Sequence, residues 1–270
     1  MSGVLMDVHN NVATLTLNRP AARNAMSKIM VEKLAEFVRA AEHSDDVRVI
    51  LLRGAGSHFC AGGDIKDMAA ARAIGSDNGD AVAELNASFG HVALAFASSP
   101  LPVVVELKGA VMGGGFGLAC VADVVVASET TLFRLPETRL GVVPAQIAPF
   151  LVERIGFSEA KRLALTGASL DAKEALAIRL VHDVVPEDDL ECAVDKVVQQ
   201  ICAGAPQATS ATKSLLLGCF QRVDKKYIED ASHVFAHAAR SEEAVEGMTA
   251  FIEKRSPQWS TTRHHDKGKT

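Results

Sequence analysis

The chain has 270 residues, 48% of them hydrophobic and 23% charged, which is typical of a globular protein with a sizeable core. Its formal net charge of −5 argues against a broad basic surface for nucleic acid or an anionic membrane. The five cysteines contain no C-x-x-C pair, so we expect reduced thiols and a cytoplasmic protein.

The first two-thirds of the chain alternates strand-like and helix-like segments. Its N-terminus, MSGVLMDVHN, lacks the basic and apolar regions of a secretory signal, and no apolar run is long enough to span a bilayer. Near-alternating residues predict two strands within 3–18, and the apolar runs 47–54 and 103–107 predict strands buried on both faces. Ser27 is a suitable N-cap for a helix over 28–43, and an alanine-rich helix over about 80–99 ends at Pro100.

The remainder is mostly helical, with one further strand at 181–185. Further helices are predicted at 187–203, 208–220, 226–238 and 241–254. The predicted organisation is therefore a core over 1–198, a C-terminal helical region over 199–258 and a polar, disordered tail over 259–270.

Two glycine-rich segments are the strongest local signals for chemistry. The first is the loop AGSHFCAGGD (55–64), and the second is the run Gly113-Gly114-Gly115 at the start of a short helix. Glycine costs about 1 kcal/mol in a helix relative to alanine, so three in succession require close packing or the close approach of a ligand to the backbone. The unpaired N–H groups of a helix start also attract negative charge.

Several common sites do not fit these glycines. A dinucleotide fingerprint requires G-x-G-x-x-G, but the sixth position is Leu118 counted from Gly113 and Cys120 counted from Gly115. A P-loop and a G-x-S-x-G nucleophile elbow are also missing from the sequence. His233 and His237 are four residues apart on a predicted helix, but without H-E-x-x-H we expect no metal site.

The sequence resembles the crotonase family, the enoyl-CoA hydratases and isomerases. The likeness runs from residue 4 to about 257 and is carried by motifs in order: NRPAARNAMS, FCAGGDIKDM (59–68), LPVVVELKGAVMGGGFGLACVADVVVAS (101–128), FRLPETRLGVVP (133–144), ERIG, ALTG and GMTAFIEKRSP (247–257). The resemblance implies an α/β fold, a crotonase-like spiral of ββα units with a C-terminal helical oligomerisation region.

The resemblance also implies an oxyanion hole made of two backbone N–H groups, which match Gly63 and Gly114 here. Fixed donors in a dry site stabilise the charge that an enolate concentrates on the thioester oxygen, and losing one donor typically costs about 3 kcal/mol. Family hydratases commonly carry two catalytic glutamates. The second matches Glu137, but the first position is Gly117, which cannot transfer a proton.

This departure leaves the reaction open between two related chemistries. In a hydratase, Glu137 must act as base and then as acid, or another group must help, and His91 and Glu84 on the alanine-rich helix are candidates. A 1,3-proton shift needs only one carboxylate, so Gly117 favours isomerase or specialised hydratase chemistry over that of an ordinary two-glutamate hydratase. Other enolate reactions, such as decarboxylation or thioester hydrolysis, and a catalytically silent coenzyme A–binding scaffold or RNA-binding relative are further alternatives.

The acyl pocket and the coenzyme A site can be matched in the same way. The resemblance places Gly117, His91, Ala145 and Gln146 at the acyl group, and VPAQIAPF (143–150) is similar to hydratases of branched glutaconyl-CoA esters. We expect no permanently bound cofactor and no metal, with coenzyme A entering as the carrier of the substrate. Residues matching the family's coenzyme A contacts are Ala21, Ala22, Arg23, Ala61, Gly63, Asp64 and Ile65, together with Phe251 and Lys254, which in relatives reach the nucleotide from an adjacent subunit. A homotrimer or a dimer of trimers is expected, with no nucleic-acid or membrane partner.

Overall fold

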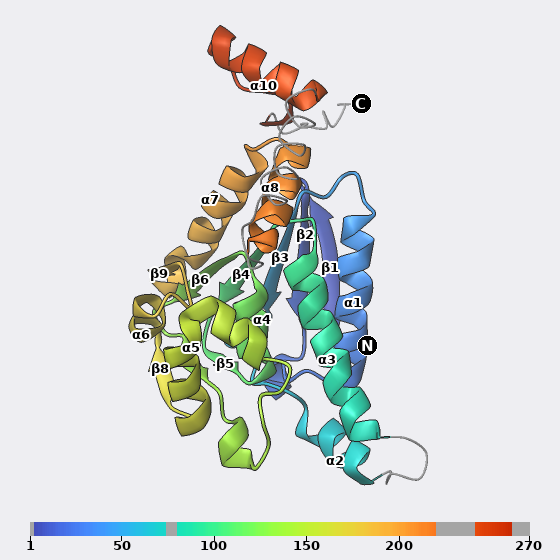
Figure 1. Cartoon of the computed structure of the whole chain (residues 1–270), viewed down its shortest axis with the longest axis vertical. Helices are drawn as coiled ribbons and strands as arrows, with labels where there is room; N and C mark the ends of the chain where they lie inside the picture. Colours follow the sequence, from blue (N-terminus) through green and yellow to red (C-terminus); the bar gives the residue numbers. More distant parts are fainter. Residues whose placement is uncertain (1–2, 74–79, 220–240, 261–270) are drawn as a thin grey trace, which may run out of the picture.

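The computed structural model describes residues 3–73, 80–219 and 241–260, and a mixed sheet lies at its centre (Figure 1). The strand order is β1-β2-β3-β4-β6-β9, in which β1 is antiparallel to β2 and the other neighbours are parallel. These strands are β1 Val4–His9, β2 Val12–Leu17, β3 Val49–Gly54, β4 Val103–Leu107, β6 Val124–Ser128 and β9 Asp183–Val185.

Helices cover both faces of this sheet, which explains its apolar central strands. Val103 and Val105 of β4 pack in the main core, whereas Val104 between them packs with Leu190 and Val194 of α7 on the other face. Because neighbouring side chains in a strand point to opposite faces, both sets must be apolar. The predicted buried strands at 47–54 and 103–107 are thereby confirmed as β3 and β4.

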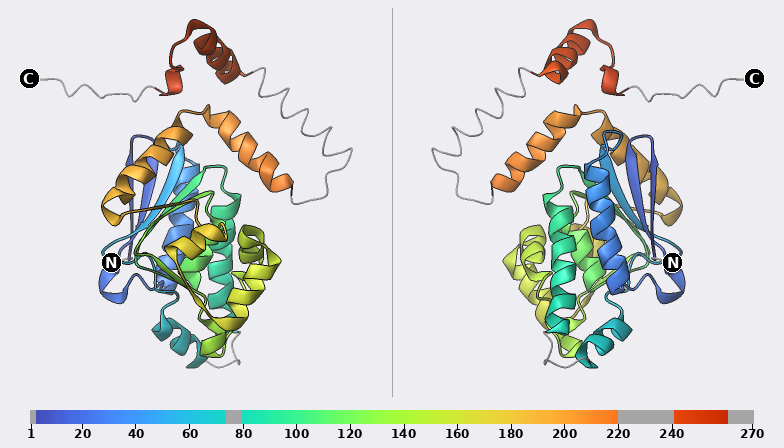
Figure 2. Two further views of the ribbon diagram at one scale, coloured as in Figure 1. Left: turned by 90° about the vertical axis from the view of Figure 1, so that its left-hand side faces the viewer. Right: turned by 90° about the vertical axis from the view of Figure 1, so that its right-hand side faces the viewer.

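The helices of the main core lie side by side along one face of the sheet. Figure 2 shows α1 next to α3, and α4 packs between α3 and α5. Ser27 caps α1 as predicted, since its Oγ accepts a hydrogen bond from the Met30 N–H at 3.4 Å. The helices are α1 Lys28–Glu42, α2 Ile65–Ala73, α3 Ala81–Ser98, α4 Gly114–Val121, α5 Ala148–Thr166, α6 Ala172–Ala177, α7 Leu190–Cys202, α8 Pro206–Gly218 and α10 Glu242–Glu253, with 3₁₀ turns η1 Pro20–Ala22, η2 Glu137–Leu140, η3 Glu187–Asp189 and η4 Gln258–Ser260.

A second, smaller sheet was not predicted from the sequence. It consists of β5 Ala110–Met112, β7 Leu132–Arg134 and β8 Ser169–Asp171, with β7 in the middle. Each strand has three residues, which is too short for an alternating pattern to be recognised. The sheet matters for the site because α4 follows directly after β5 and η2 follows shortly after β7.

The C-terminal helices extend away from the sheet. α7 runs through residue 198, so the predicted division between core and C-terminal region falls inside a helix that packs on the sheet. Figure 1 shows α10 at one end of the molecule and α2 at the other. The indole N–H of Trp259 donates to the Ala203 carbonyl oxygen, which joins the segment after α10 to the end of α7. The predicted helix at 226–238, with His233 and His237, and residues 261–270 of the predicted tail lie outside the described residues.

Helix α8 is fastened to the core by a buried lysine. The Lys213 ammonium lies 2.7 Å from Asp123 Oδ2 and donates to the Leu101 carbonyl oxygen at 3.1 Å. Asp123 also accepts from the Val103 N–H at 2.7 Å, so its carboxylate joins α8 to the start of β4.

Replacing this lysine is expected to destabilise the fold. Breaking a buried ion pair by removing one partner costs about 3–5 kcal/mol. Since the Asp123 side chain is 33% exposed, we expect Lys213→Met to lower the free energy of unfolding by about 2 kcal/mol. Urea denaturation measures this change, and Lys196→Met on the exposed side of α7 is the control. An unchanged free energy of unfolding in Lys213→Met would contradict the structural role.

Candidate active site

The loop that follows β3 is tied to the start of α1 through Met26. The Met26 N–H donates to the Gly62 carbonyl oxygen at 2.8 Å, and the Asp64 N–H donates to the Met26 carbonyl oxygen at 2.9 Å. Gly62 has φ of +106°, which favours glycine. Between these anchors, the Gly63 N–H has no acceptor among the described residues and is available to a ligand.

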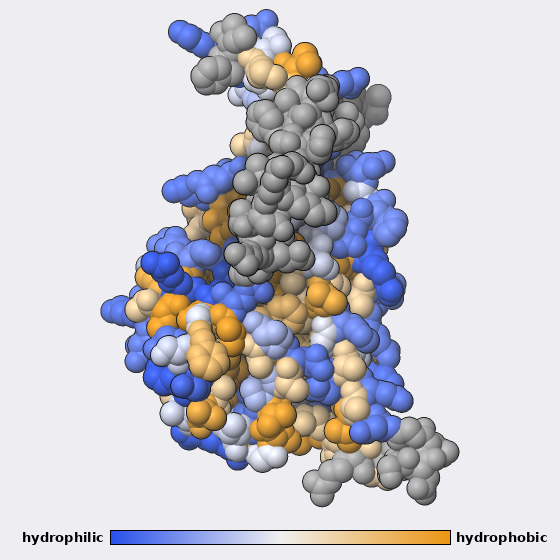
Figure 3. Space-filling view, viewed as in Figure 1, coloured by the Kyte–Doolittle hydropathy of each residue, from blue (hydrophilic) through white to orange (hydrophobic). Residues whose placement is uncertain are grey.

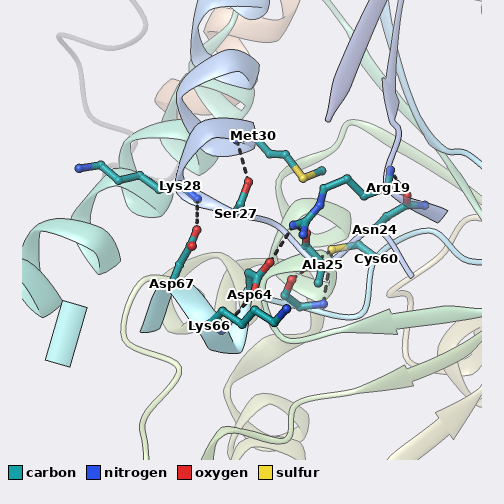
Figure 4. A network of polar contacts seen from close by, with 11 residues as sticks. Arg19, Asn24, Ala25, Ser27, Lys28, Met30, Cys60, Asp64, Lys66 and Asp67 are labelled. Atoms are coloured by element: carbon teal, nitrogen blue, oxygen red, sulfur yellow. Dashed lines mark hydrogen bonds and ion pairs between the residues drawn. The ribbon is translucent and has the colours of Figure 1, made fainter. Parts of the chain in front are cut away.

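An ion pair holds the same loop from the other side (Figure 4). Arg19 Nη1 lies 2.8 Å from Asp64 Oδ2 and also donates to the Ala25 carbonyl oxygen. The hydrogen bond from Arg19 lowers the pKa of the Asp64 carboxyl below its usual range. Asp64 is therefore a charged anchor beside Gly63, with its second oxygen accepting from the Lys66 N–H.

Cys60 joins this loop to the second glycine-rich segment. Its N–H donates to the Ala110 carbonyl oxygen at 3.0 Å, and its own carbonyl oxygen accepts from the Met112 N–H at 2.9 Å. Its Sγ lies 3.4 Å from the Gly62 nitrogen. Complete burial raises the pKa of the Cys60 thiol to about 12, so the group is neutral and acts in packing.

Each glycine of the run Gly113-Gly114-Gly115 has a different structural role. Gly113 has φ of +51° and precedes α4, and Gly115 lies so close to Cys60 that an added Cβ would be 2.7 Å from the Cys60 Cβ. Gly114 is the first residue of α4, and its N–H has no acceptor among the described residues. That N–H is one of the unpaired donors of a helix start, where the macrodipole favours negative charge.

Glu137 lies against this helix start. A Cβ on Gly113 would be 3.1 Å from Glu137 Oε1, so the carboxylate contacts bare backbone there. Its Oε2 is buried and has no hydrogen-bond partner among the described residues. Burial raises the pKa of the Glu137 carboxyl above its usual value. An unpaired buried carboxylate is costly to the fold and is the arrangement expected of a proton-transfer group.

One pocket of about 590 Å³ brings these groups together. Gly63, Gly114 and Glu137 line it, and so do Ala145 and Gln146, which were predicted at the acyl group. Most of the remaining wall is apolar: Met26, Val31, Met68, Val82, Leu85, Phe89, Val142, Val143 and Ile147. Val142 and Val143 are among the exposed large hydrophobic side chains, and Figure 3 shows apolar residues at the surface in the lower half of the face in view.

Comparisons with known proteins agree with this geometry. A family model described as enoyl-CoA hydratase/isomerase matches residues 7–262. The chain belongs to this family. A solved enoyl-CoA hydratase/isomerase from Marinobacter aquaeolei has a TM-score of 0.93 and 43% identity, covering 97% of this chain and 100% of that one. AtuE of Pseudomonas aeruginosa has a TM-score of 0.92 and 46% identity, covering 96% and 100%. The 2,3-dehydroadipyl-CoA hydratase of Escherichia coli is 31% identical over 96% of this chain and 99% of its own.

The family membership confirms the crotonase resemblance and the crotonase fold that the motifs implied. It also draws attention to position 117, because this protein has Gly117 where hydratases of the family commonly have a catalytic glutamate. Gly117 is buried on α4, and an added Cβ would lie 3.0 Å from Ile147 Cγ1 and 3.1 Å from Phe89 Cζ. Two apolar side chains therefore occupy the space that a side chain at 117 would need.

The other predicted acyl-pocket residues lie elsewhere. Gly117 and His91 are not among the residues that line the pocket, and the His91 side chain is exposed on α3. Glu84 is also exposed and outside the lining. The sequence pattern gave no reason to single out Phe89 or Ile147, because both read as ordinary core residues.

The predicted coenzyme A residues form two adjacent segments. The Ala61 N–H donates to the Arg23 carbonyl oxygen at 3.0 Å, so Ala21, Ala22 and Arg23 lie beside Ala61, Gly63, Asp64 and Ile65. Arg23 and Ile65 are exposed, and Gly63 and Asp64 also line the pocket. Lys254 follows α10 at the far end of the molecule, and the side chain of Phe251 lies outside the described residues (Figure 1). A single chain therefore does not bring these two positions to the pocket.

The described residues contain neither a metal-ligand cluster nor a membrane-spanning helix. No cluster of three or more His, Cys, Asp or Glu side chains there has an arrangement that could hold a metal ion. No helix there is long and apolar enough to cross a membrane.

Proposed function

We propose that this protein is an enoyl-CoA hydratase in which Glu137 is the only catalytic carboxylate and the N–H groups of Gly63 and Gly114 bind the thioester oxygen. The observation that carries the proposal is the buried Oε2 of Glu137, which has no hydrogen-bond partner among the described residues and shares one pocket with Gly63 and Gly114, whose N–H groups have no acceptor there. General acid–base chemistry needs a carboxyl group whose pKa is raised toward neutral pH, which is the direction that burial gives here.

The reaction requires Glu137 to act twice. As base, it takes a proton from water while the water oxygen bonds to C3 of the enoyl group and the double-bond electrons move to the thioester oxygen. The resulting enolate oxygen accepts hydrogen bonds from Gly63 and Gly114. As acid, Glu137 then returns its proton to C2, the carbonyl re-forms, and the net change is addition of H and OH across the double bond.

Coenzyme A is the carrier of the substrate in this proposal, and no permanently bound cofactor takes part. The adjacent segments at 21–23 and 61–65, of which Gly63 and Asp64 line the pocket, are proposed to hold the pantetheine and nucleotide parts. For the acyl group we propose a branched or glutaconyl-type chain, as the sequence of residues 143–150 suggested. The name of the Escherichia coli relative, a 2,3-dehydroadipyl-CoA hydratase, supports an acyl group that carries oxygen at its far end.

The alternative is an enoyl-CoA isomerase, and Gly117 is the observation that favours it. An isomerase needs one carboxylate to remove a proton at one carbon and return it at another, and among the described residues Glu137 is the carboxylate of this pocket with a buried oxygen that has no partner. Incubation with enoyl-CoA esters in deuterated water distinguishes the two activities by product mass. A product heavier by one molecule of water supports the hydratase, and deuterium incorporation without added water supports the isomerase.

The raised pKa of Glu137 predicts the pH dependence of turnover. Glu137 must be ionised to act as base, so kcat/KM is expected to fall as the pH drops through the pKa of this carboxyl. Because that pKa is raised, the fall should begin at a higher pH than the value of about 4.3 of an exposed glutamate would give. A pH–rate profile measures it, and a flat profile down to pH 4–5 would contradict the assignment.

A homotrimer, or a dimer of trimers, is proposed as the assembly. Exposed apolar side chains on α8 and α10, among them Leu216, Val245 and Met248, support it because they offer a surface for a second copy. Sedimentation analysis of the full chain tests this, and a monomer would contradict it. Cytoplasmic location is the remaining prediction, checked by cell fractionation.

A further inference from the structure

The pocket contains one polar feature that the proposed reaction does not use. Gln146 Nε2 donates to Asn86 Oδ1 at 3.0 Å, which joins the segment before α5 to the middle of α3. Both side chains line the pocket, with Leu85, Phe89 and Ile147 around them. An amide pair in a mostly apolar wall, which also contains Asp64, Asp67 and Asp80, is the kind of group that orients a ligand and determines specificity.

Two residues of helix α3, Asn86 and Gly90, determine where the Gln146 side chain lies. A Cβ on Gly90 would lie 2.3 Å from Gln146 Oε1 and 2.7 Å from its Cδ, so only glycine leaves the side chain its place. Asn86 and Gly90 are four residues apart and therefore lie on the same face of the helix. Asn86 accepts a hydrogen bond from the Gln146 amide, and the missing side chain at Gly90 leaves space for that amide. Together the two residues set the orientation of the amide pair.

Hydrogen-bonding capacity remains after the two amides have bonded to each other. The bond uses one N–H of Gln146, which leaves its second N–H and both N–H groups of Asn86 as donors. The aspartates of the wall are already engaged. Asp64 pairs with Arg19, Asp67 accepts from the Lys28 N–H, and Asp80 accepts from the Ala83 N–H.

We propose that the Asn86–Gln146 amide pair binds an oxygen substituent at the far end of the acyl group and so selects oxygen-bearing enoyl-CoA esters over plain hydrocarbon ones. This rests on the proposed function, because it takes the pocket to be the acyl-CoA site. No lysine, arginine or histidine lines the pocket among the described residues. The oxygen is therefore held by neutral N–H donors, which accommodate either a hydroxyl group or a carboxylate.

Binding of saturated thioesters tests the pair without relying on turnover. The ligands are hexanoyl-CoA, 6-hydroxyhexanoyl-CoA and adipyl-CoA, which share six acyl carbons and end in methyl, hydroxyl and carboxylate groups. The corresponding five-carbon set covers a shorter reach. We expect the wild type to bind one of the oxygen-ended esters about tenfold more tightly than its methyl-ended partner. The ester that gains affinity identifies the group as hydroxyl or carboxylate.

Three variants remove the preference by different routes. Gln146→Met and Asn86→Leu delete amide groups at similar volume, and Gly90→Ala displaces Gln146 while leaving both amides in the chain. Each should abolish the preference for the oxygen-ended ester, measured within each variant as the ratio of its affinities for the oxygen-ended and methyl-ended esters. Glu84→Gln, an exposed position on the same helix, is the control.

Two results would overturn the proposal. One is a wild type that binds oxygen-ended and methyl-ended esters equally at both chain lengths. The other is a preference that persists in Gln146→Met and Asn86→Leu. Hydration of the corresponding 2-enoyl esters by the wild type is measured separately, so failure of the hydratase assignment and failure of the amide pair are distinguishable.

Discussion

The Glu137→Gln enzyme is expected to hydrate enoyl-CoA esters about 10³-fold more slowly than the wild type while binding them with similar affinity. The amide keeps the size of the carboxylate and its contact with Gly113, but it cannot take a proton from water. Gly117 offers no second carboxylate, and its space is occupied by Phe89 and Ile147, so no neighbouring acid on α4 can substitute. The effect should therefore appear in kcat, measured by loss of the enoyl thioester absorbance under saturating substrate.

Stability provides the matching control for this variant. Burial raises the pKa of Glu137 in the folded state, so the charged form that is present at neutral pH disfavours folding. Removing the charge should leave the free energy of unfolding at neutral pH unchanged or slightly higher. A slow enzyme that is at least as stable as the wild type identifies Glu137 as a catalytic group whose position costs stability. Turnover at the wild-type rate would show that another group transfers the proton.

A second variant tests whether the lost acid can be restored. In Gly117→Glu, the new side chain would collide with Ile147 and Phe89, because even a Cβ lies about 3 Å from both. The variant is therefore expected to lose stability without gaining rate. At position 117 this protein therefore lacks a carboxylate and also lacks the space for one, because Phe89 and Ile147 lie beside it.

The sequence was sufficient to predict features that depend on residues close together in the chain. The apolar run of β4, the cap at Ser27 and the two glycine loops depend on residues close together in the chain, so their patterns indicated these elements, whereas the oxyanion positions Gly63 and Gly114 were implied by the family motifs. Glu137 is different. Its residue type and neighbours are ordinary for an exposed loop, and only the family motif singled it out.

What the sequence could not show are contacts between distant segments. Asn86 and Gln146 are sixty residues apart, and the reason for Gly90 is a side chain on another element. Phe89 and Ile147 likewise reach Gly117 from other parts of the chain. The sequence showed that an acid was missing at 117, but not that apolar side chains had taken its place. These contacts follow from tertiary packing.

The second oxyanion donor can be removed by a single substitution that suits the fold. Gly114 is the first residue of α4, a position that accepts proline because its N–H makes no helical hydrogen bond. Gly114→Pro deletes the proposed donor, and Gly114→Ala is its matched control because it adds bulk and keeps the N–H. The Cβ of either residue would meet Met26 Cε at 2.6 Å, the end of a flexible side chain that can move.

We expect the proline variant to be about 10²–10³-fold slower in kcat than the alanine variant, since a preorganised N–H at a developing oxyanion has that effect in other enzymes. The far-ultraviolet circular dichroism and thermal midpoints of the two variants should agree, because the helix start tolerates both. The loss should be larger for kcat than for the affinity of a saturated thioester, whose carbonyl oxygen carries less negative charge than the enolate. If the two variants turn over at the same rate, the Gly114 N–H does not stabilise the enolate, and the charge must be held by Gly63 alone.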